Sequence, residues 1–229
     1  MTNETVSDLT LDELDRDGAV REAFDAVSSR GSFLTGAFVG SGALLATLAA
    51  PGRAAAAPRS DTAILNFALT LEYLQASFYT ETERVGAVGG ALARVPRQLG
   101  AVERAHVRAL RDVLGRAAVK RPSFNFRGTT EERTKFLKTA VAFEDLAVAA
   151  YKGQATRVES PALLSAAVAI HSVEARHAAW MRYLAGFTPA GSAFDEGKPE
   201  SEVRRIVAST RFIAAQPRTT GRGEPRTTG

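Results

Sequence analysis

Apolar side chains recur at steps of three and four residues along four segments of the chain, which is the period of an amphipathic helix. The segments span about residues 61–84, 94–117, 131–156 and 161–186, and few glycines or prolines fall inside them. No stretch shows the strict alternation of apolar and polar positions that a half-buried strand requires. The pattern therefore predicts an all-α fold built from four long helices.

The four apolar stripes form two matching pairs, the first with the third and the second with the fourth. The first two stripes and the last two stripes each contain one glutamate per stripe, and the separation is similar: 31 residues from Glu72 to Glu103 and 30 from Glu144 to Glu174. The matched positions are Leu65 and Leu137, Leu69 and Val141, Glu72 and Glu144, Ala76 and Val148, Tyr79 and Tyr151, Leu99 and Ile170, Glu103 and Glu174, His106 and His177, and Leu110 and Met181. We infer that a two-helix unit has been duplicated.

The connections predict how the two units are joined. Short turns close each pair, and Pro161 stands where the fourth helix should begin. Residues 119–130 are longer than a tight turn requires and contain two phenylalanines, so we expect a crossover between helices two and three. Thr129 and Thr130, followed by two glutamates, are expected to cap the third helix. The prediction is a four-helix bundle with one long crossover.

Composition agrees with a globular protein of one main domain. The chain has 229 residues, 45% of them apolar, which is enough to bury a core. The absence of cysteine excludes disulfides, thiolate ligands and cysteine nucleophiles. The net charge is only +4 and no basic run is interleaved with aromatic residues, so nucleic acid is not an expected partner.

The N-terminal region is predicted to direct export. Residues 36–50 form an apolar run that is short and glycine-rich for a spanning helix, and small residues 54–57 offer cleavage sites. Just before this run, SSRGSFLTG resembles a twin-arginine signal, although Gly31 replaces the second arginine and Thr35 the lysine. The expected location is the periplasm, the cell envelope or the exterior, with transient membrane contact through the signal. An uncleaved anchor and an apolar cytoplasmic arm are the alternatives.

This pattern divides the chain into four parts. They are a leader and export signal at 1–57, the bundle at 58–186, a C-terminal arm with a short helix at 187–215, and a tail at 216–229. The tail repeats PRTTG twice and is predicted to be disordered.

Polar residues interrupt each apolar stripe only at its centre. Glu and His three residues apart lie on one face of a helix, and this pair occurs in both the second and the fourth segments. The interrupting residues are Glu72, Glu103, His106, Glu144, Glu174 and His177. Four buried carboxylates without partners would cost several kcal/mol each, and two divalent cations would balance their charge. The stripes carry no Lys or Arg that could do so instead.

The six residues predict a metal centre with two iron or two manganese ions. Carboxylate oxygens with one imidazole per metal suit these ions, whereas zinc usually prefers fewer ligands and more nitrogen or sulfur. By analogy with known dinuclear carboxylate sites, Glu103 and Glu174 are assigned as bridging ligands and Glu72 and Glu144 as terminal ones. A metal-free polar network is the alternative. The sequence identifies no catalytic residue and no site for an organic cofactor.

Several neighbouring residues allow two interpretations. His171 is either a hydrogen-bond donor behind the ligands or a histidine at the edge of the core, and we favour the second. Tyr79 and Tyr151 are expected to be core aromatics that cover the site rather than a redox relay. Gln75 either hydrogen-bonds a ligand or faces solvent.

Three stretches together resemble the ferritin-like domain family that includes desiccation-related proteins: LNFALTLEYLQASFY, RPSFNF and HSVEARHAAWMRYL. The resemblance covers about residues 60–215. It implies a ferritin-like four-helix bundle with a dinuclear iron or manganese site in a protein that is frequently exported. Related proteins include ferroxidases, oxygen-activating oxidases and manganese catalases, and the fold does not choose among them.

Three functions therefore compete. The first is an exported, redox-active stress-response protein, a di-iron or di-manganese oxidoreductase that acts on dioxygen or peroxide. The second is a protein that binds metal without turnover, and the third is a desiccation-related structural protein in which metal holds helices together. A homo-oligomer is compatible with all three, but a ferritin cage is less expected because of the leader and the C-terminal arm.

Overall fold

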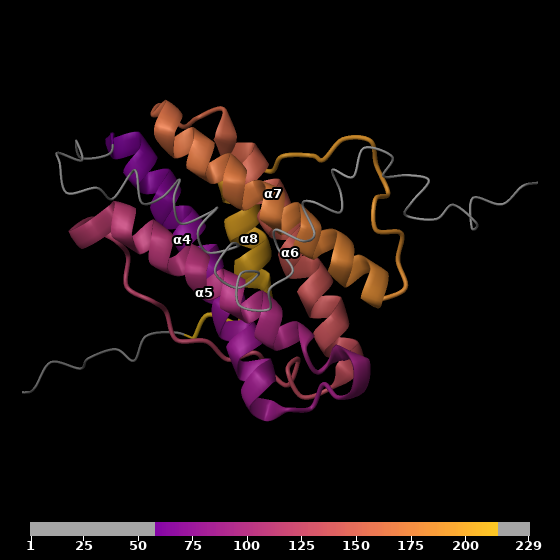
Figure 1. The fold of residues 1–229 in the computed structure, drawn as a ribbon. Helices are drawn as coiled ribbons and strands as arrows, with labels where there is room; N and C mark the ends of the chain where they lie inside the picture. Colours follow the sequence, from indigo (N-terminus) through magenta and orange to yellow (C-terminus); the bar gives the residue numbers. More distant parts are fainter. Residues whose placement is uncertain (1–57, 215–229) are drawn as a thin grey trace, which may run out of the picture. The chain divides into compact units, whose positions relative to one another are not determined.

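The computed structural model describes residues 58–214, and this part of the chain is helical. Two short 3-10 turns lie at Gly90–Leu92 and Gly115–Ala117. The helices are α4 at Arg59–Val85, α5 at Val95–Leu114, α6 at Arg133–Ala155, α7 at Pro161–Leu184 and α8 at Glu200–Thr210 (Figure 1). The predicted all-α four-helix bundle is confirmed. The predicted export signal and tail lie outside the described residues.

The bundle consists of two helix pairs. α4 packs along α5, α6 packs along α7, and α4 also contacts α6. Residues 118–132 connect the pairs as the predicted long crossover, and within it Phe124 forms an isolated antiparallel bridge with Ile213. The backbone N–H of Asn125 donates to the carbonyl of Phe212 at 2.8 Å. The crossover is thus held by the C-terminal segment.

The two predictions about helix starts had different outcomes. α7 begins at Pro161, as expected, after the N-cap residue Ser160. The prediction that Thr129 or Thr130 caps the third helix was wrong, because Glu132 is the N-cap of α6 and accepts from the backbone N–H of Thr134 at 2.8 Å. A carboxylate there also interacts favourably with the helix dipole. Thr130 is buried and donates instead to Glu81 of α4 at 3.0 Å.

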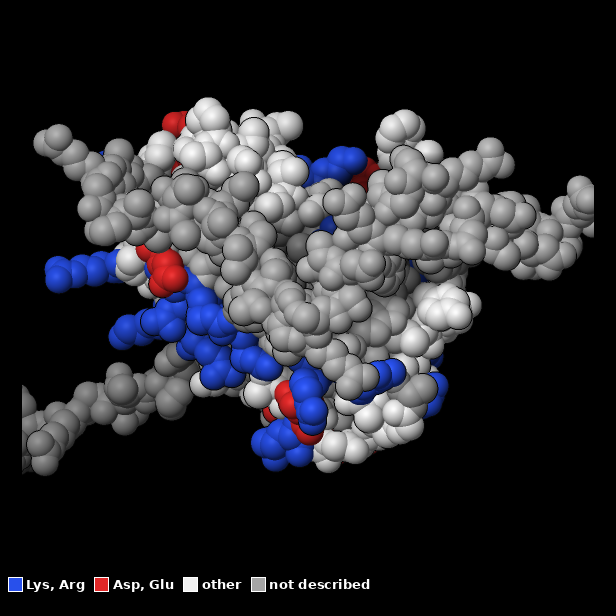
Figure 2. Space-filling view, in the orientation of Figure 1, with Lys and Arg blue, Asp and Glu red and all other residues white. Residues whose placement is uncertain are grey.

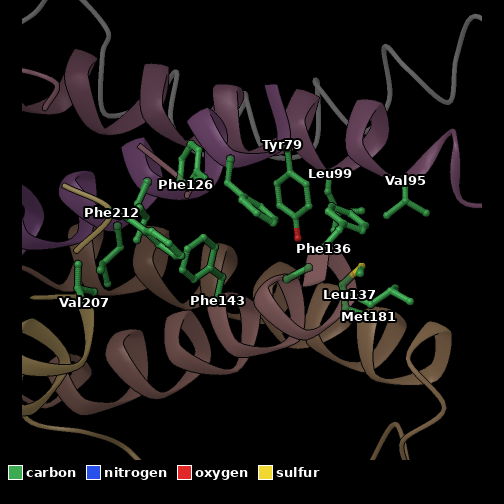
Figure 3. Close-up of a cluster of buried hydrophobic side chains, with 14 of the residues drawn as sticks. Tyr79, Val95, Leu99, Phe126, Phe136, Leu137, Phe143, Met181, Val207 and Phe212 are labelled. Carbon is green, nitrogen blue, oxygen red and sulfur yellow. The ribbon is translucent and has the colours of Figure 1, made fainter. Parts of the chain in front are cut away.

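A cluster of aromatic rings forms one part of the core (Figure 3). Phe78 of α4 stacks on Phe136, 5.6 Å away, and meets Phe126 and Phe143 edge to face at 5.4 and 5.1 Å. Phe126 comes from the crossover, and Phe212, which follows α8, packs edge to face against it. The crossover and the C-terminal segment therefore contribute to the core of the bundle.

α8 covers α6 rather than projecting from the bundle. Val203 and Val207 are buried in the core, and the backbone N–H of Lys198 donates to the carbonyl of Ala149 at 2.8 Å. The approach requires glycine at position 153, because a Cβ atom there would lie 2.0 Å from the carbonyl oxygen of Lys198. None of the helices in residues 58–214 combines the length and apolar character needed to cross a membrane.

α5 shows how the sequence orients the polar residues. Leu99, Glu103, His106 and Leu110 face the interior, whereas arginines such as Arg97 and Arg111 are exposed. Lys and Arg side chains gather over the stretch where Figure 1 draws α5 (Figure 2). The long basic side chains stay in water, and Glu103 and His106 lie on the inner face of this helix.

Candidate metal centre

The six residues predicted as metal ligands lie together in the middle of the bundle. Each helix pair contributes three of them, Glu72, Glu103 and His106 from α4 and α5, and Glu144, Glu174 and His177 from α6 and α7. All four carboxylates have an exposed fraction of 0%, and both histidines have 7%. The apolar stripes on either side of these residues account for their burial.

Contacts cross between the two helix pairs. The Nδ1 atom of His106 lies 3.1 Å from Oε1 of Glu174 and 3.3 Å from Oε2 of Glu72. The Nδ1 atom of His177 lies 2.9 Å from Oε1 of Glu103 and 3.6 Å from Oε2 of Glu144. His106 therefore faces Glu174 of the other half and two glutamates of its own, since Oε2 of Glu103 also lies 3.5 Å from its Nδ1 atom. His177 faces one glutamate of each half.

The ligand atoms form two overlapping groups that could each hold a metal ion. One group consists of Glu72, Glu103, His106 and Glu174, and the other of Glu103, Glu144, Glu174 and His177. Within each group the nitrogen and oxygen atoms lie within 4.8 Å of one another. Glu103 and Glu174 belong to both groups, which is the placement expected of carboxylates that bridge two ions.

Six buried atoms at the centre face one another but make no hydrogen bond of acceptable geometry. They are Oε2 of Glu72, both carboxylate oxygens of Glu103, Nδ1 of His106, Oε1 of Glu174 and Nδ1 of His177. Leaving a buried polar atom unpaired costs about 1–3 kcal/mol, and more if it is charged. All six face the same small volume, so their arrangement fits cations better than it fits a self-contained polar network.

The remaining carboxylate oxygens are held by neighbouring side chains. Tyr151 of α6 donates to Oε1 of Glu72 at 2.6 Å, and Tyr79 of α4 donates to Oε1 of Glu144. Each tyrosine thus binds the glutamate of the other half, and the hydroxyl of Tyr79 points away from α4 into the bundle (Figure 3). Both rings are buried and cover the site, as expected, but sequence spacing did not predict that the contacts would be reciprocal.

Gln75 is the polar neighbour that the sequence left undecided. Its side chain is 2% exposed, and its amide nitrogen lies 3.2 Å from Oε2 of Glu144 and 3.4 Å from Oε2 of Glu174. The signal that could have identified it is its spacing, three residues after Glu72 on the same helix face. His171 is half-buried and belongs to neither group of candidate ligands.

Burial and charge set the protonation of the site when no metal is bound. Burial raises the pKa of Glu72 to about 7, against the influence of nearby His106. Burial and the Glu103 carboxylate raise the pKa of Glu174 well above its usual range. Burial acts in the same direction on Glu103, but His106 and His177 outweigh it and hold the pKa of that carboxyl below its usual range.

The imidazoles and phenols show the complementary shifts. Burial alone would lower the pKa of His106 and His177, but the facing carboxylates raise both well above their usual value. Burial and the nearby carboxylates raise the pKa of Tyr79 and Tyr151. Protons on the imidazoles therefore partly balance the carboxylates in the metal-free site, and the tyrosines stay protonated as donors.

Comparison with protein families places the chain in a known family. A family model described as a ferritin-like domain matches residues 60–186, which is more than half of the chain and contains all six candidate ligands. No curated protein matches the sequence.

Proposed function

The chain belongs to the ferritin-like domain family, and on that premise we propose that its buried cluster holds two iron or two manganese ions that react with dioxygen or peroxide. The fold and the cluster are compatible with a metal site. The observation that carries the proposal is the set of six unpaired atoms that face one another in a fully buried position.

In this proposal each ligand has a distinct role. Glu103 and Glu174 would be shared by both ions, since both residues belong to the two overlapping groups. Glu72 and Glu144 are terminal ligands, each oriented by a tyrosine from the other half. His106 and His177 supply one neutral nitrogen to each ion. Two divalent ions would then balance the four carboxylates, and the imidazoles would give up the protons that they carry in the metal-free site.

The donor set favours iron or manganese over zinc. The site offers many oxygens and only one nitrogen per ion, and such sites suit ions that accept five or six ligands. Bound iron or manganese would supply the change of oxidation state that a reaction with dioxygen or peroxide requires. The tyrosine hydroxyls keep their protons at Oη and fix the terminal carboxylates, so the protein provides a constant geometry during that change.

Burial supports a very small substrate. The carboxylates are inaccessible and the histidines are 7% exposed, so an organic substrate would not reach the ligands without rearrangement. A cavity of about 490 Å³ lies between α6, α7 and residues 189–196, and its lining includes none of the six candidate ligands. Dioxygen and peroxide are small enough to diffuse through packed side chains.

We further propose that the protein acts outside the cytoplasm in protection against oxidative or drying stress. The location is supported by the apolar run at residues 36–50 and the twin-arginine-like SSRGSFLTG before it, and the stress role by the resemblance to desiccation-related proteins. A fusion of residues 1–60 to a reporter tests this proposal directly. Transport of the reporter across the membrane is expected, and a reporter retained in the cytoplasm would contradict it.

The redox proposal is tested by adding peroxide to the metal-loaded protein. The expected result is peroxide consumption with a change in the absorbance spectrum, and neither should occur in the matched variant Glu103→Gln with Glu174→Gln. An exposed-site variant, Glu83→Gln, should behave as the unchanged protein because Glu83 lies at the surface, where it pairs with Arg97. If the loaded protein binds both ions but leaves peroxide and dioxygen unchanged, the redox proposal is wrong.

A structural role for the metal is the second candidate, and one observation favours it. The candidate ligands come from all four bundle helices, so bound ions would link α4, α5, α6 and α7 at one point. Loss of folding on metal removal, together with inertness towards peroxide and dioxygen, would support this role.

A further inference from the structure

One position breaks the match between the two halves of the metal centre. Gln75 follows Glu72 by three residues, and the corresponding position after Glu144 is Ala147. Both side chains line the same small cavity of about 10 Å³ between α4 and α6. The duplicated site therefore contains one amide where strict symmetry would give two or none.

The amide nitrogen of Gln75 faces two candidate ligands. It lies 3.2 Å from Oε2 of Glu144 and 3.4 Å from Oε2 of Glu174, and the residue is 2% exposed. The NH2 group must be the end that points at these oxygens, because the amide oxygen in that place would be repelled by two carboxylates. Gln75 thus donates both of its N–H groups to ligand oxygens.

These hydrogen bonds leave the two metal positions with different donor sets. Beside His106, four atoms are free of hydrogen bonds: Oε2 of Glu72, Oε2 of Glu103, Oε1 of Glu174 and the imidazole Nδ1 itself. Beside His177, only Oε1 of Glu103 and Nδ1 are free. The other two oxygens there, Oε2 of Glu144 and Oε2 of Glu174, accept from Gln75.

The two terminal glutamates show the same difference. Glu72 uses one oxygen for Tyr151 and keeps the other free. Glu144 has no free oxygen, because it accepts from Tyr79 at Oε1 and from Gln75 at Oε2. An N–H bond to a carboxylate oxygen withdraws charge from it and occupies a lone pair, so the oxygen becomes a weaker ligand.

We propose that Gln75 is a positioning residue that makes the two metal positions unequal, so that the first ion binds beside His106 and the second, more weakly, beside His177. The proposal rests on the proposed function, because it presupposes that the cluster binds two ions. Hydrogen bonds to charged groups are strong enough to separate the two dissociation constants by roughly tenfold or more.

The test is a titration of the metal-free protein with Mn²⁺, in which electron paramagnetic resonance measures the free ion. Two binding steps separated by roughly tenfold or more are expected. His106→Gln should remove the tight step and leave the weak one, and His177→Gln should do the reverse. Circular dichroism of each variant checks that the helices remain folded.

Two further variants test the role of the amide itself. Gln75→Met removes both N–H donors at similar volume, and the weak step should strengthen until the two constants differ by less than about threefold. Gln75→Ala is the alternative if the methionine variant does not fold. The exchange of Gln75→Ala with Ala147→Gln moves the amide to the other half, and the tight step should then depend on His177.

The possible results separate this inference from the proposed function. Two equal steps in the unchanged protein, or a separation that persists in Gln75→Met, would overturn the role of Gln75 and leave the dinuclear site intact. A protein that binds neither Mn²⁺ nor Fe²⁺ would overturn the proposed function, and the inference with it.

Discussion

The helix pair α4–α5 and the helix pair α6–α7 bring the same chemistry to the centre of the bundle by the same spacing. In each pair a glutamate on the first helix faces a Glu-x-x-His unit on the second. The pairs differ in what surrounds these groups, because Gln75 stands opposite Ala147 and the helix starts are fixed by different contacts. The shared residues form the candidate metal site, and the unshared ones give its two candidate positions different surroundings.

The strongest way to break the comparison is to remove the carboxylates that both halves share. Replacement of Glu103 and Glu174 by glutamine should reduce metal content from about two ions per chain to almost none, because each candidate group of ligands loses two of its carboxylates. Elemental analysis after loading with iron or manganese measures this. Retention of two ions by the double variant would show that these carboxylates are not the bridge.

The next largest expected effect, on stability, is at the contact between α4 and the turn that precedes α7. Asp61 is buried and accepts from the backbone N–H groups of Glu159 at 2.8 Å and Ser160 at 3.0 Å. Asp61→Ala should lower the free energy of unfolding by about 2–4 kcal/mol, since two buried N–H groups lose a charged acceptor. Denaturation by urea measures the loss.

A neighbouring exposed contact provides the control for Asp61. Ser60 donates to Glu159 at the surface, and Ser60→Ala should change the free energy of unfolding by less than about 0.5 kcal/mol. Equal effects of the two substitutions would contradict a special role for the buried aspartate.

The reciprocal tyrosines sharpen the comparison. Tyr151→Phe leaves Glu72 without any hydrogen bond, whereas Tyr79→Phe leaves Glu144 with the bond from Gln75. The metal-free Tyr151→Phe variant should therefore be less stable than the Tyr79→Phe variant by about 1 kcal/mol. Thermal and urea unfolding of the two variants, after a chelator has removed any metal, gives the difference. A larger loss of stability in Tyr79→Phe would contradict the account.

The metal-free and metal-loaded states should respond to pH in opposite ways. Glu72 has a folded pKa of about 7, above its ordinary 4.5, so its contribution to metal-free stability is full below pH 4.5 and is lost as pH rises towards 7. The raised pKa values of His106 and His177 extend this loss above pH 6.5. Bound ions require deprotonated ligands, so metal affinity should rise over the same range, by about tenfold per pH unit for each proton displaced.

Unfolding of the protein after metal removal by a chelator measures how stability depends on pH. Titration with Mn²⁺ at the same pH values measures how metal affinity depends on pH. Glu103 does not alter the predicted fall in metal-free stability between pH 4.5 and 7. Its pKa is lowered, so its contribution to stability is lost only at more acidic pH. Parallel trends for stability and metal affinity would contradict the protonation described for the site.

Helical spacing was sufficient to predict the bundle and the convergence of the six candidate ligands. Glu72 and Glu103 interrupt stripes that are otherwise apolar, and a polar residue at the centre of such a stripe is buried when the helix packs. Spacing identifies the face on which a residue lies but not the partner it meets across the bundle. Helical spacing therefore did not predict that Tyr79 and Gln75 would contact residues of the other half.

The misassigned cap of α6 has a related cause. Thr130 and Glu132 are both acceptable N-cap residues, and local sequence does not choose between them. The choice depends on Glu81 of α4, a distant residue that accepts the hydroxyl of Thr130 and leaves the cap to Glu132.

The metal content of the purified protein tests the central claim most directly. The chain should be expressed with iron and manganese both available, purified without chelators and analysed for its elements. The account predicts about two iron or manganese ions per chain, lost on substitution of Glu103 and Glu174 together. A folded protein that remains free of metal after reconstitution with either ion would contradict it, and the buried carboxylates would then require another explanation.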